Sequence, residues 1–157
     1  MRATFSVLLA IVIMLLASCS RTCYCTAATL YMDYVSFANT TTDTIVVRRY
    51  TKNSNFASLL DTALLTSHNA VYTTRQDTLS IRPNAEAVTL RSFYDYILYL
   101  PAIKRSDSLF GIFETRDTKE GSHDLECTCI NRILSFYLNR DTVQVIDPAS
   151  PHVYINQ

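Results

Sequence analysis

Residues 133–146 read ILSFYLNRDTVQVI, and this stretch decides the fold class. Its first six residues are mostly aromatic, leucine or β-branched. The polar triplet Asn139-Arg140-Asp141 follows, and residues 142–146 are again rich in β-branched side chains. Two such runs joined by a short polar turn are typical of a β-hairpin. The stretch therefore predicts two adjacent antiparallel strands.

Similar short runs recur along most of the chain. They occupy residues 30–37, 44–50, 70–74, 78–81, 93–100, 109–115, 125–130 and 152–155, the last as an edge strand. Residues 75–77 predict a second hairpin turn. The run 93–100 is apolar on both faces except for Asp95, which predicts a strand buried on both sides. Sequential hairpins predict a mainly β fold, either an antiparallel β-sandwich of immunoglobulin-like or transthyretin-like kind or a small barrel.

One segment has the spacing of a helix instead. Ser54 is a suitable N-cap residue, and apolar residues recur at helical spacing over residues 56–65. We therefore expect at most one short helix, over residues 56–65. The pattern of residues 84–87 is ambiguous.

Length and composition narrow the classes of function. The chain has 157 residues, of which 48% are hydrophobic, and we expect residues 23–157 to form a single β-rich domain. Fourteen basic residues balance fourteen acidic ones without a basic block, which argues against capture of nucleic acid. The two glycines, Gly111 and Gly121, are too few and too far apart for a Gly-rich phosphate loop or a dinucleotide fingerprint.

The first eighteen residues have the organisation of an export signal. Arg2 supplies a positive charge, and residues 5–17 are apolar except for Ser6. A helix of that length rises about 20 Å, which is less than the roughly 30 Å hydrocarbon core of a bilayer. We therefore interpret residues 1–18 as a signal peptide and not as a membrane span.

The end of this segment, Leu16-Ala17-Ser18-Cys19, resembles the lipobox of bacterial lipoprotein precursors. The resemblance implies cleavage before Cys19, diacylglycerol on its sulfur and acylation of its new amino group, with residues 19–22 as a lipidated tether. Two or more acyl chains anchor a protein firmly. Ser20 follows the cysteine where some Gram-negative lipoproteins carry Asp, which by the same resemblance implies the outer membrane. The alternative is ordinary cleavage, for instance after Ser20, which yields a free secreted protein.

The four other cysteines form two C-x-C motifs, Cys23-Tyr24-Cys25 and Cys127-Thr128-Cys129. In an exported protein such pairs are most often disulfides. Residues two apart on a strand face the same side. Antiparallel neighbours would pair Cys23 with Cys129 and Cys25 with Cys127, whereas parallel neighbours would pair Cys23 with Cys127 and Cys25 with Cys129. Pairing within a motif, free thiols and a four-thiolate metal site are the alternatives, although structural zinc sites usually use C-x₂₋₄-C.

Short triplets of Asp, Ser or Thr and an aliphatic residue recur where turns give way to strands. Such triplets suit these positions because Asp accepts hydrogen bonds from turn amides and Thr favours strands. They also resemble an O-glycosylation signal of certain Gram-negative envelope proteins. That resemblance implies candidate acceptors at Thr44, Thr62, Thr78, Ser108 and Thr142.

Few side chains indicate catalysis. His68, His123 and His152 lie far apart, and the chain has no G-x-S-x-G or H-E-x-x-H motif. A Ser-His-Asp triad can still assemble in space, because its order along a chain is free. We nevertheless expect no enzyme activity and no cofactor.

Aromatic and basic residues have ordinary structural interpretations. Phe93, Tyr94, Tyr96 and Tyr99 are interpreted as core residues, with a stacking surface for a sugar or peptide as the alternative. The pairs Arg48-Arg49 and Lys104-Arg105 are interpreted as solvated strand edges or turns.

Together these patterns predict a lipid-anchored envelope protein, facing the periplasm from the outer membrane. We expect its role to be that of a structural or accessory module that contacts an envelope protein partner. The alternative is a lipoprotein that binds a sugar, peptide or metal through its aromatic or cysteine residues. A contiguous exposed aromatic patch or a concave pocket would favour binding.

Overall fold

The computed structural model describes residues 27–37, 43–119, 128–148 and 150–157, and these residues are mainly β. Two single 3-10 turns, Glu86–Val88 and Pro101–Ile103, interrupt the strands. The strands are β1 (Thr29–Val35), β2 (Ile45–Thr51), β3 (Leu59–Leu65), β4 (Ala70–Arg75), β5 (Thr78–Pro83), β6 (Leu90–Arg91), β7 (Tyr94–Leu100), β8 (Arg105–Lys119), β9 (Thr128–Leu138), β10 (Asp141–Gln144) and β11 (His152–Asn156).

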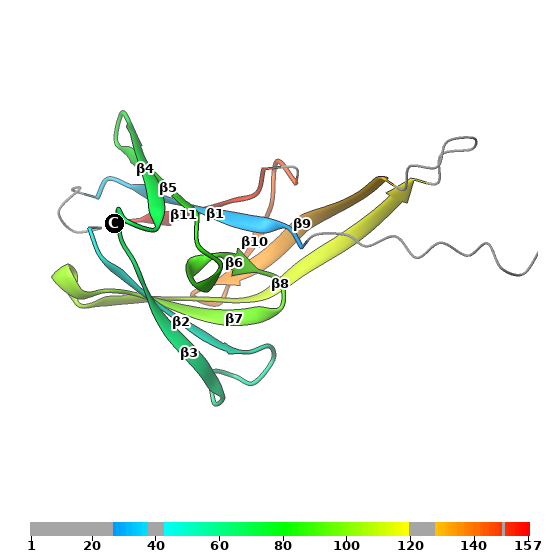
Figure 1. Ribbon diagram of the computed structural model, residues 1–157, viewed down its shortest axis with the longest axis horizontal. Helices are drawn as coiled ribbons and strands as arrows, with labels where there is room; N and C mark the ends of the chain where they lie inside the picture. Colours follow the sequence, from blue (N-terminus) through cyan, green and yellow to red (C-terminus); the bar gives the residue numbers. More distant parts are fainter. Residues whose placement is uncertain (1–26, 38–42, 120–127, 149) are drawn as a thin grey trace, which may run out of the picture.

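The strands form two sheets that pack face to face (Figure 1). One sheet has the order β11-β1-β5-β4, with β6 also paired to β1, and the other has the order β10-β9-β8-β7-β2-β3. The pairings between described strands are antiparallel except that of β1 with β11. The sequence-based prediction of a mainly β, sandwich-like fold is confirmed, and the last strand lies at a sheet edge as expected.

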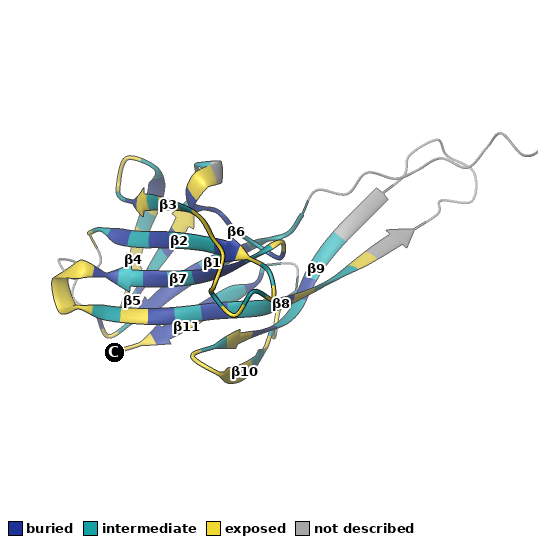
Figure 2. Cartoon of the chain, turned by 90° about the horizontal axis from the view of Figure 1, so that it is seen from below, coloured by how far each residue is buried: buried dark blue, intermediate teal, exposed yellow. Residues whose placement is uncertain are grey.

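The core lies between the sheets and is built by strand alternation, which places every second side chain on the inner face (Figure 2). Its fully buried members include Leu30, Met32 and Tyr34 on β1, Ile45 and Val47 on β2, Tyr96, Leu98 and Leu100 on β7, and Val153 on β11. Burial raises the pKa of the Tyr34 phenol, because the charged form would lose its hydration there.

The hairpin predicted from residues 133–146 is confirmed. β9 and β10 pair antiparallel with Leu138 opposite Asp141. The two turn residues Asn139 and Arg140 have φ of 51° and 80°, the left-handed backbone that a two-residue hairpin turn requires. The second predicted hairpin, β4 with β5, is also present and turns at Gln76 and Asp77.

The helix predicted over residues 56–65 is wrong, because Leu59–Leu65 is strand β3 and pairs with β2. Of its apolar side chains, Leu65 is buried, whereas Leu59, Leu60 and Leu64 are more than half exposed. Ser54 does not cap a helix. Its carbonyl accepts from Ala57 N within the turn between β2 and β3. The ladder of hydrogen bonds with β2 outweighs the local helical spacing, which marks no buried face.

Strand lengths also differ from the predictions in one region. Two separate strands were expected at 125–130 and 133–138, but β9 runs without a break from Thr128 to Leu138. β8 extends beyond the expected 109–115, from Arg105 to Lys119, because β9 pairs with it as far as Thr128.

The expected two-sided burial of residues 93–100 holds in part. Asp95 is buried on the outer side of β7, and Ile97 is half-buried there.

Candidate functional site

The two longest strands form an arm that projects from the sandwich (Figures 1 and 2). β7 pairs with β8 only between Arg105 and Leu109, and β10 pairs with β9 only between Ser135 and Leu138. From Glu114 and Ile133 outward the ladder consists of β8 and β9 alone. Five residues beyond Glu114 extend about 17 Å at the rise of a strand. Within the described residues, neither outer edge of this arm is paired with another strand.

A β-bulge at Gly111 marks the point where β8 leaves the sandwich. The register with β9 shifts between Phe110 and Phe113, and Gly111 has φ of +59°. Asp95 accepts hydrogen bonds from Gly111 N at 3.2 Å and Asn53 N at 2.7 Å. Such bulges bend a strand away from its neighbours, so the bulge and its buried carboxylate direct the arm.

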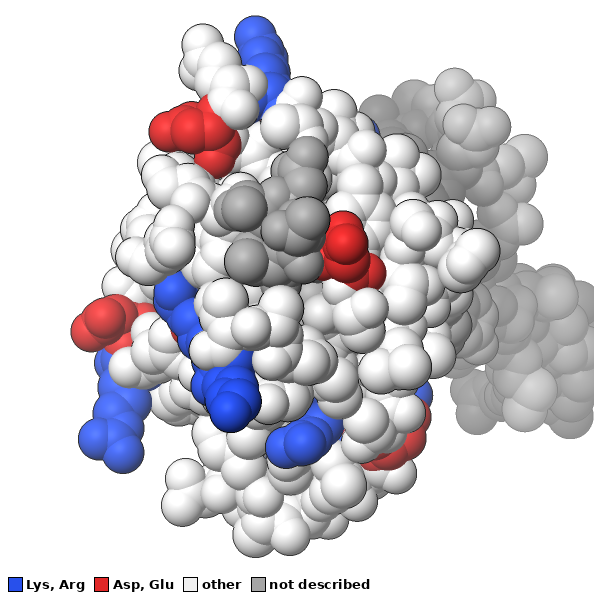
Figure 3. Space-filling model, turned by 90° about the vertical axis from the view of Figure 1, so that its left-hand side faces the viewer, with Lys and Arg blue, Asp and Glu red and all other residues white. Residues whose placement is uncertain are grey.

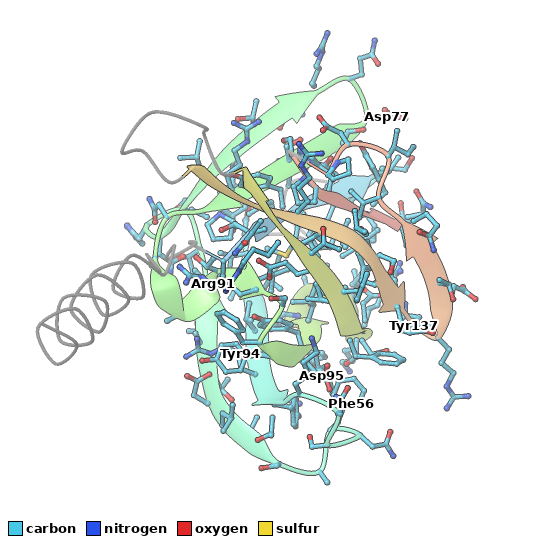
Figure 4. The ribbon with its side chains drawn as sticks, turned by 90° about the vertical axis from the view of Figure 1, so that its right-hand side faces the viewer. Phe56, Asp77, Arg91, Tyr94, Asp95 and Tyr137 are labelled. Carbon is cyan, nitrogen blue, oxygen red and sulfur yellow. The ribbon has the colours of Figure 1, made fainter. Side chains whose placement is uncertain are left out.

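Aromatic rings pack around the bulge. Phe110 stacks on Tyr137 with ring centroids 5.1 Å apart, and Phe56 meets Phe110 edge-on at 5.7 Å. Figure 4 looks onto this end of the molecule, where Phe56, Asp95 and Tyr137 lie together. The β2–β3 turn that carries Phe56 is thereby joined to the base of the arm.

An open groove of about 440 Å³ lies beside the arm where it leaves the sandwich. Two phenylalanines in its lining are more than half exposed, Phe93 at 58% and Phe113 at 55%. Lys52, Glu114 and Arg116 supply charged groups to the same groove. Exposed aromatic rings beside charged groups favour contact with another molecule.

Hydrogen bonds hold the polar wall of the groove in place. Lys52 Nζ donates to Ser92 O at 2.7 Å and to Ile112 O at 2.8 Å. The Glu114 carboxylate accepts from Ser92 Oγ and, at 3.2 Å, from Ala28 N. The first described residues of the chain are thus joined to the base of the arm.

The aromatic residues of 93–99 do not form one exposed surface. Tyr96 is buried, its hydroxyl accepts from Arg91 N at 2.7 Å, and burial raises its pKa. Tyr94 and Tyr99 are half-buried and lie under the guanidinium groups of Arg49 and Arg48, 5.1 and 5.8 Å from the ring centroids. Phe93 alone of this group is exposed, and it reaches the groove described above.

Arg48 and Arg49 lie on β2, which is a central strand and not the expected edge. Arg49 forms an ion pair with Asp61 directly opposite on β3. The hydrogen bond from Arg49 lowers the pKa of Asp61, and the same bond raises the pKa of Arg49. On the face shown in Figure 3, opposite the arm, side chains of both signs are scattered among uncharged residues.

The predicted cysteine sites lie mostly outside the described residues. This applies to Cys19, Cys23, Cys25 and Cys127, whereas the backbone of Cys129 lies on β9 opposite Thr118 of the arm. Lipidation, disulfides and a thiolate metal site therefore stay predictions. Within the described ranges no group of three or more His, Cys, Asp or Glu could hold a metal ion. No helix in the part of the chain that is described is long and apolar enough to cross a membrane.

The candidate glycosylation sites differ in accessibility. Thr62 and Thr142 are exposed, whereas Thr44, Thr78 and Ser108 are half-buried. The Ser108 hydroxyl lies 3.4 Å from Asn139 Oδ1 at the β9–β10 turn. A sugar requires a free hydroxyl on the surface, so the exposure of Thr62 and Thr142 suits the predicted modification better than that of the other three.

Neither the groove nor the arm was predicted from the sequence. The sequence does carry a signal for the arm, because β-rich residues extend unusually far on either side of residues 120–127. Local patterns, however, divide these two runs into shorter strands. Comparison with protein-family models, curated proteins and solved structures finds no match to this chain. Its function has to be inferred from its own residues.

Proposed function

We propose that this protein is a lipid-anchored accessory module of the bacterial envelope, and that it contacts a partner protein through the arm and its groove. Cys19 carries the lipid in this proposal, and the β-sandwich faces the periplasm from the outer membrane. The observation that carries the contact is the arm itself, a two-stranded ladder without a strand on either outer edge within the described residues.

Unpaired strand edges favour an extended polypeptide as the partner. Backbone N–H and C=O groups along such an edge can pair with an added strand, and nearby pockets then take alternate side chains of that strand. Phe93 and Phe113 are exposed in the groove beside β8 and supply an apolar contact for those side chains. We therefore assign to the arm an extended segment with apolar side chains from an envelope protein.

The position of Ala28 supports a role close to the membrane. Ala28 N is bonded to Glu114 at the base of the arm. Ala28 is nine positions after Cys19, and a segment of that length spans at most about 32 Å when fully extended. A lipid at Cys19 would keep the base of the arm within that distance of the bilayer surface.

The same geometry supports disulfides between the two C-x-C motifs. Cys25 lies three residues before Ala28, so its Cα can reach at most about 11 Å from that of Ala28. Cys129 lies four residues from Ile133, the strand partner of Glu114, which is about 13 Å along β9. Chain length therefore allows the first motif to reach the part of the arm that carries Cys129, and we propose that the two motifs are joined.

Two measurements in cells test this function. The first is metabolic labelling with radioactive palmitate, which we expect to label the intact chain but not a Cys19→Ala variant. An unlabelled chain that fractionates as a free periplasmic protein would exclude anchoring.

The second measurement is photo-cross-linking from a benzoyl-phenylalanine placed at Phe113, at Phe93 or, as a control, at Val71. Val71 is equally exposed but lies on β4 in the other sheet. We expect positions 113 and 93 to cross-link to the same envelope protein through one extended peptide of it, and position 71 to give no such product. Equal products from all three positions, or none from 113 and 93, would exclude the arm as the contact.

A further inference from the structure

Three side chains away from the arm form a hydrogen-bonded series. His152 Nδ1 lies 2.7 Å from Asp33 Oδ2, and His152 Nε2 lies 3.3 Å from Ser150 Oγ. A carboxylate only accepts hydrogen bonds, so Nδ1 donates to Asp33, and Nε2 of a neutral ring accepts from the Ser150 hydroxyl. The order carboxylate, imidazole, hydroxyl is the one that activates a serine nucleophile.

The parallel pairing of β1 with β11 brings these residues together (Figure 1). Tyr31 lies opposite His152 and Asp33 lies opposite Tyr154. Because Leu30, Met32 and Tyr34 face the core, alternation places Asp33 on the outer face of the sheet. Asp33 and His152 are 119 residues apart in the sequence, so no local pattern could connect them.

The imidazole is held from several sides. The rings of Tyr31 and Tyr154 lie 5.4 and 6.2 Å from it, centroid to centroid. Asp33 is only 4% exposed, and within the described residues its second carboxylate oxygen has no hydrogen-bond partner. Ser150 follows a turn in which its N–H donates to Asp147 O at 3.1 Å. These contacts orient the ring before any substrate arrives.

A cavity of about 360 Å³ opens beside the hydroxyl and the imidazole. Ser150 and His152 both line it, together with Gln144, Ile146 and Tyr154. A volume of this size accommodates a small ligand. An electrophile bound there would meet the hydroxyl oxygen and the base at the same time.

A buried aspartate that pairs with a histidine can have a purely structural role, and that interpretation accounts for Asp33 and His152. A structural role does not explain why the Ser150 hydroxyl lies at the second ring nitrogen. Nor does it explain why the hydroxyl and the imidazole both open into one cavity. We propose that Ser150 is a nucleophile with His152 as its general base, and that the site accepts small esters. This inference does not depend on the proposed function of the arm.

The reaction balances with water as the second substrate. Ser150 Oγ attacks the ester carbonyl carbon while its proton passes to His152 Nε2. The C–O bond to the alcohol breaks, and the alcohol leaves with that proton. Water then attacks the acyl-serine, gives a proton to His152, and releases the carboxylic acid as the proton returns to Ser150. Gln144 lines the cavity and carries the amide N–H donors that a developing oxyanion requires.

A fluorophosphonate probe tests the nucleophile directly on the purified full-length chain. Attack by Ser150 forms an O–P bond and breaks the P–F bond while the hydroxyl proton passes to His152, so hydrogen fluoride is lost and a phosphonyl group replaces that hydrogen in the mass. We expect one adduct, mapped to Ser150 by peptide sequencing, and none in Ser150→Ala. The control Ser67→Ala removes an exposed serine on the β3–β4 turn and should label like the unmodified chain. If the unmodified chain gives no adduct, or an adduct elsewhere, the proposal is wrong.

Two further variants separate catalysis from a structural bond. We expect His152→Ala to label at least a hundredfold more slowly and to recover part of the rate with added imidazole, which a folding defect would not do. Asp33 is a positioning residue, and its carboxylate selects the Nδ1–H tautomer. In Asp33→Asn the amide can donate to Nδ1, so ¹⁵N shifts of His152 should report the opposite tautomer and labelling should fall. An unchanged labelling rate in either variant would overturn the proposal.

Discussion

The ring of Tyr137 packs so closely against Gly111 that it would have to move if residue 111 carried a side chain. A Cβ atom built on Gly111 would lie 2.8 Å from Tyr137 Cδ2, and its φ of +59° is one that other residues adopt at a cost. The bulge that directs the arm therefore depends on this pair. We expect Gly111→Ala to lower the free energy of unfolding by about 1–3 kcal/mol.

Urea unfolding measures this effect, with Ser106→Ala as the control on the exposed part of the same strand. The control should stay within about 0.5 kcal/mol of the unmodified chain. Combining Gly111→Ala with Tyr137→Ala should recover the part of the loss that comes from the clash. A Gly111→Ala chain as stable as the original would contradict the bulge geometry.

The buried carboxylate beside the bulge is expected to be as important as the glycine. Asp95 is 3% exposed and accepts from two backbone amides, Asn53 N and Gly111 N. Asp95→Ala leaves both backbone amides without the carboxylate that accepts from them, which we expect to cost about 2–3 kcal/mol in urea unfolding. Hydrogen exchange at the Asn53 and Gly111 amides should accelerate at the same time. The exposed Asp141 gives a matched control, since Asp141→Ala removes a carboxylate outside this network.

Neighbouring leucines on β3 distinguish the strand from the helix that its spacing indicates. Leu65 is fully buried, whereas Leu64 is 55% exposed. Leu65→Ala should therefore cost about 2–4 kcal/mol in unfolding free energy, because it leaves a cavity in the core. Leu64→Ala should change it by less than about 0.5 kcal/mol. Equal losses at the two positions would argue against the β3 register.

The ion pair across β2 and β3 is expected to contribute a small pH dependence. Arg49 lowers the pKa of Asp61 through its hydrogen bond. A lowered pKa in the folded state stabilises the fold above the unfolded pKa of about 3.9, and this stability is lost as the pH falls through the folded pKa. Because the Asp61 side chain is 43% exposed, solvent screening limits the effect to about 0.5 kcal/mol.

Urea midpoints at pH 7 and pH 2 measure this contribution. Asp61→Asn should lose stability at pH 7, and its difference from the unmodified chain should shrink as the pH falls to 2, because the carboxyl group becomes protonated first in the unfolded and then in the folded state. If the two chains differ in stability by the same amount at both pH values, the loss comes from packing and not from charge.

Intact mass measured before and after reduction tests the proposed cross-links. Two disulfides add four hydrogen atoms on reduction, and alkylation without reductant should leave Cys23, Cys25, Cys127 and Cys129 unmodified. Reduction should also destabilise the fold, by about 4.7 kcal/mol in the chain-entropy model for a loop of roughly 100 residues between the two motifs. Four alkylated thiols in the unreduced chain would show that the motifs are not joined.

Hairpins and strand faces were predictable because they depend on neighbours in the sequence. Asn139 and Arg140 separate two β-rich runs and form the two-residue turn that such a pattern indicates. The candidate sites were less accessible to prediction. Phe93, in the turn before β7, and Phe113, on β8, line one groove, and their exposure depends on where β7 and β8 separate.

Local alternation of side chains was enough to indicate a mainly β sandwich, since period-two patterns arise from backbone geometry alone. Tertiary pairing decided the rest. It made residues 59–65 a strand, because β2 offered a ladder that helical spacing could not match. It also placed Asp33 beside His152, because contacts between strands far apart in the sequence are set by sheet order and register, which no short stretch of residues encodes.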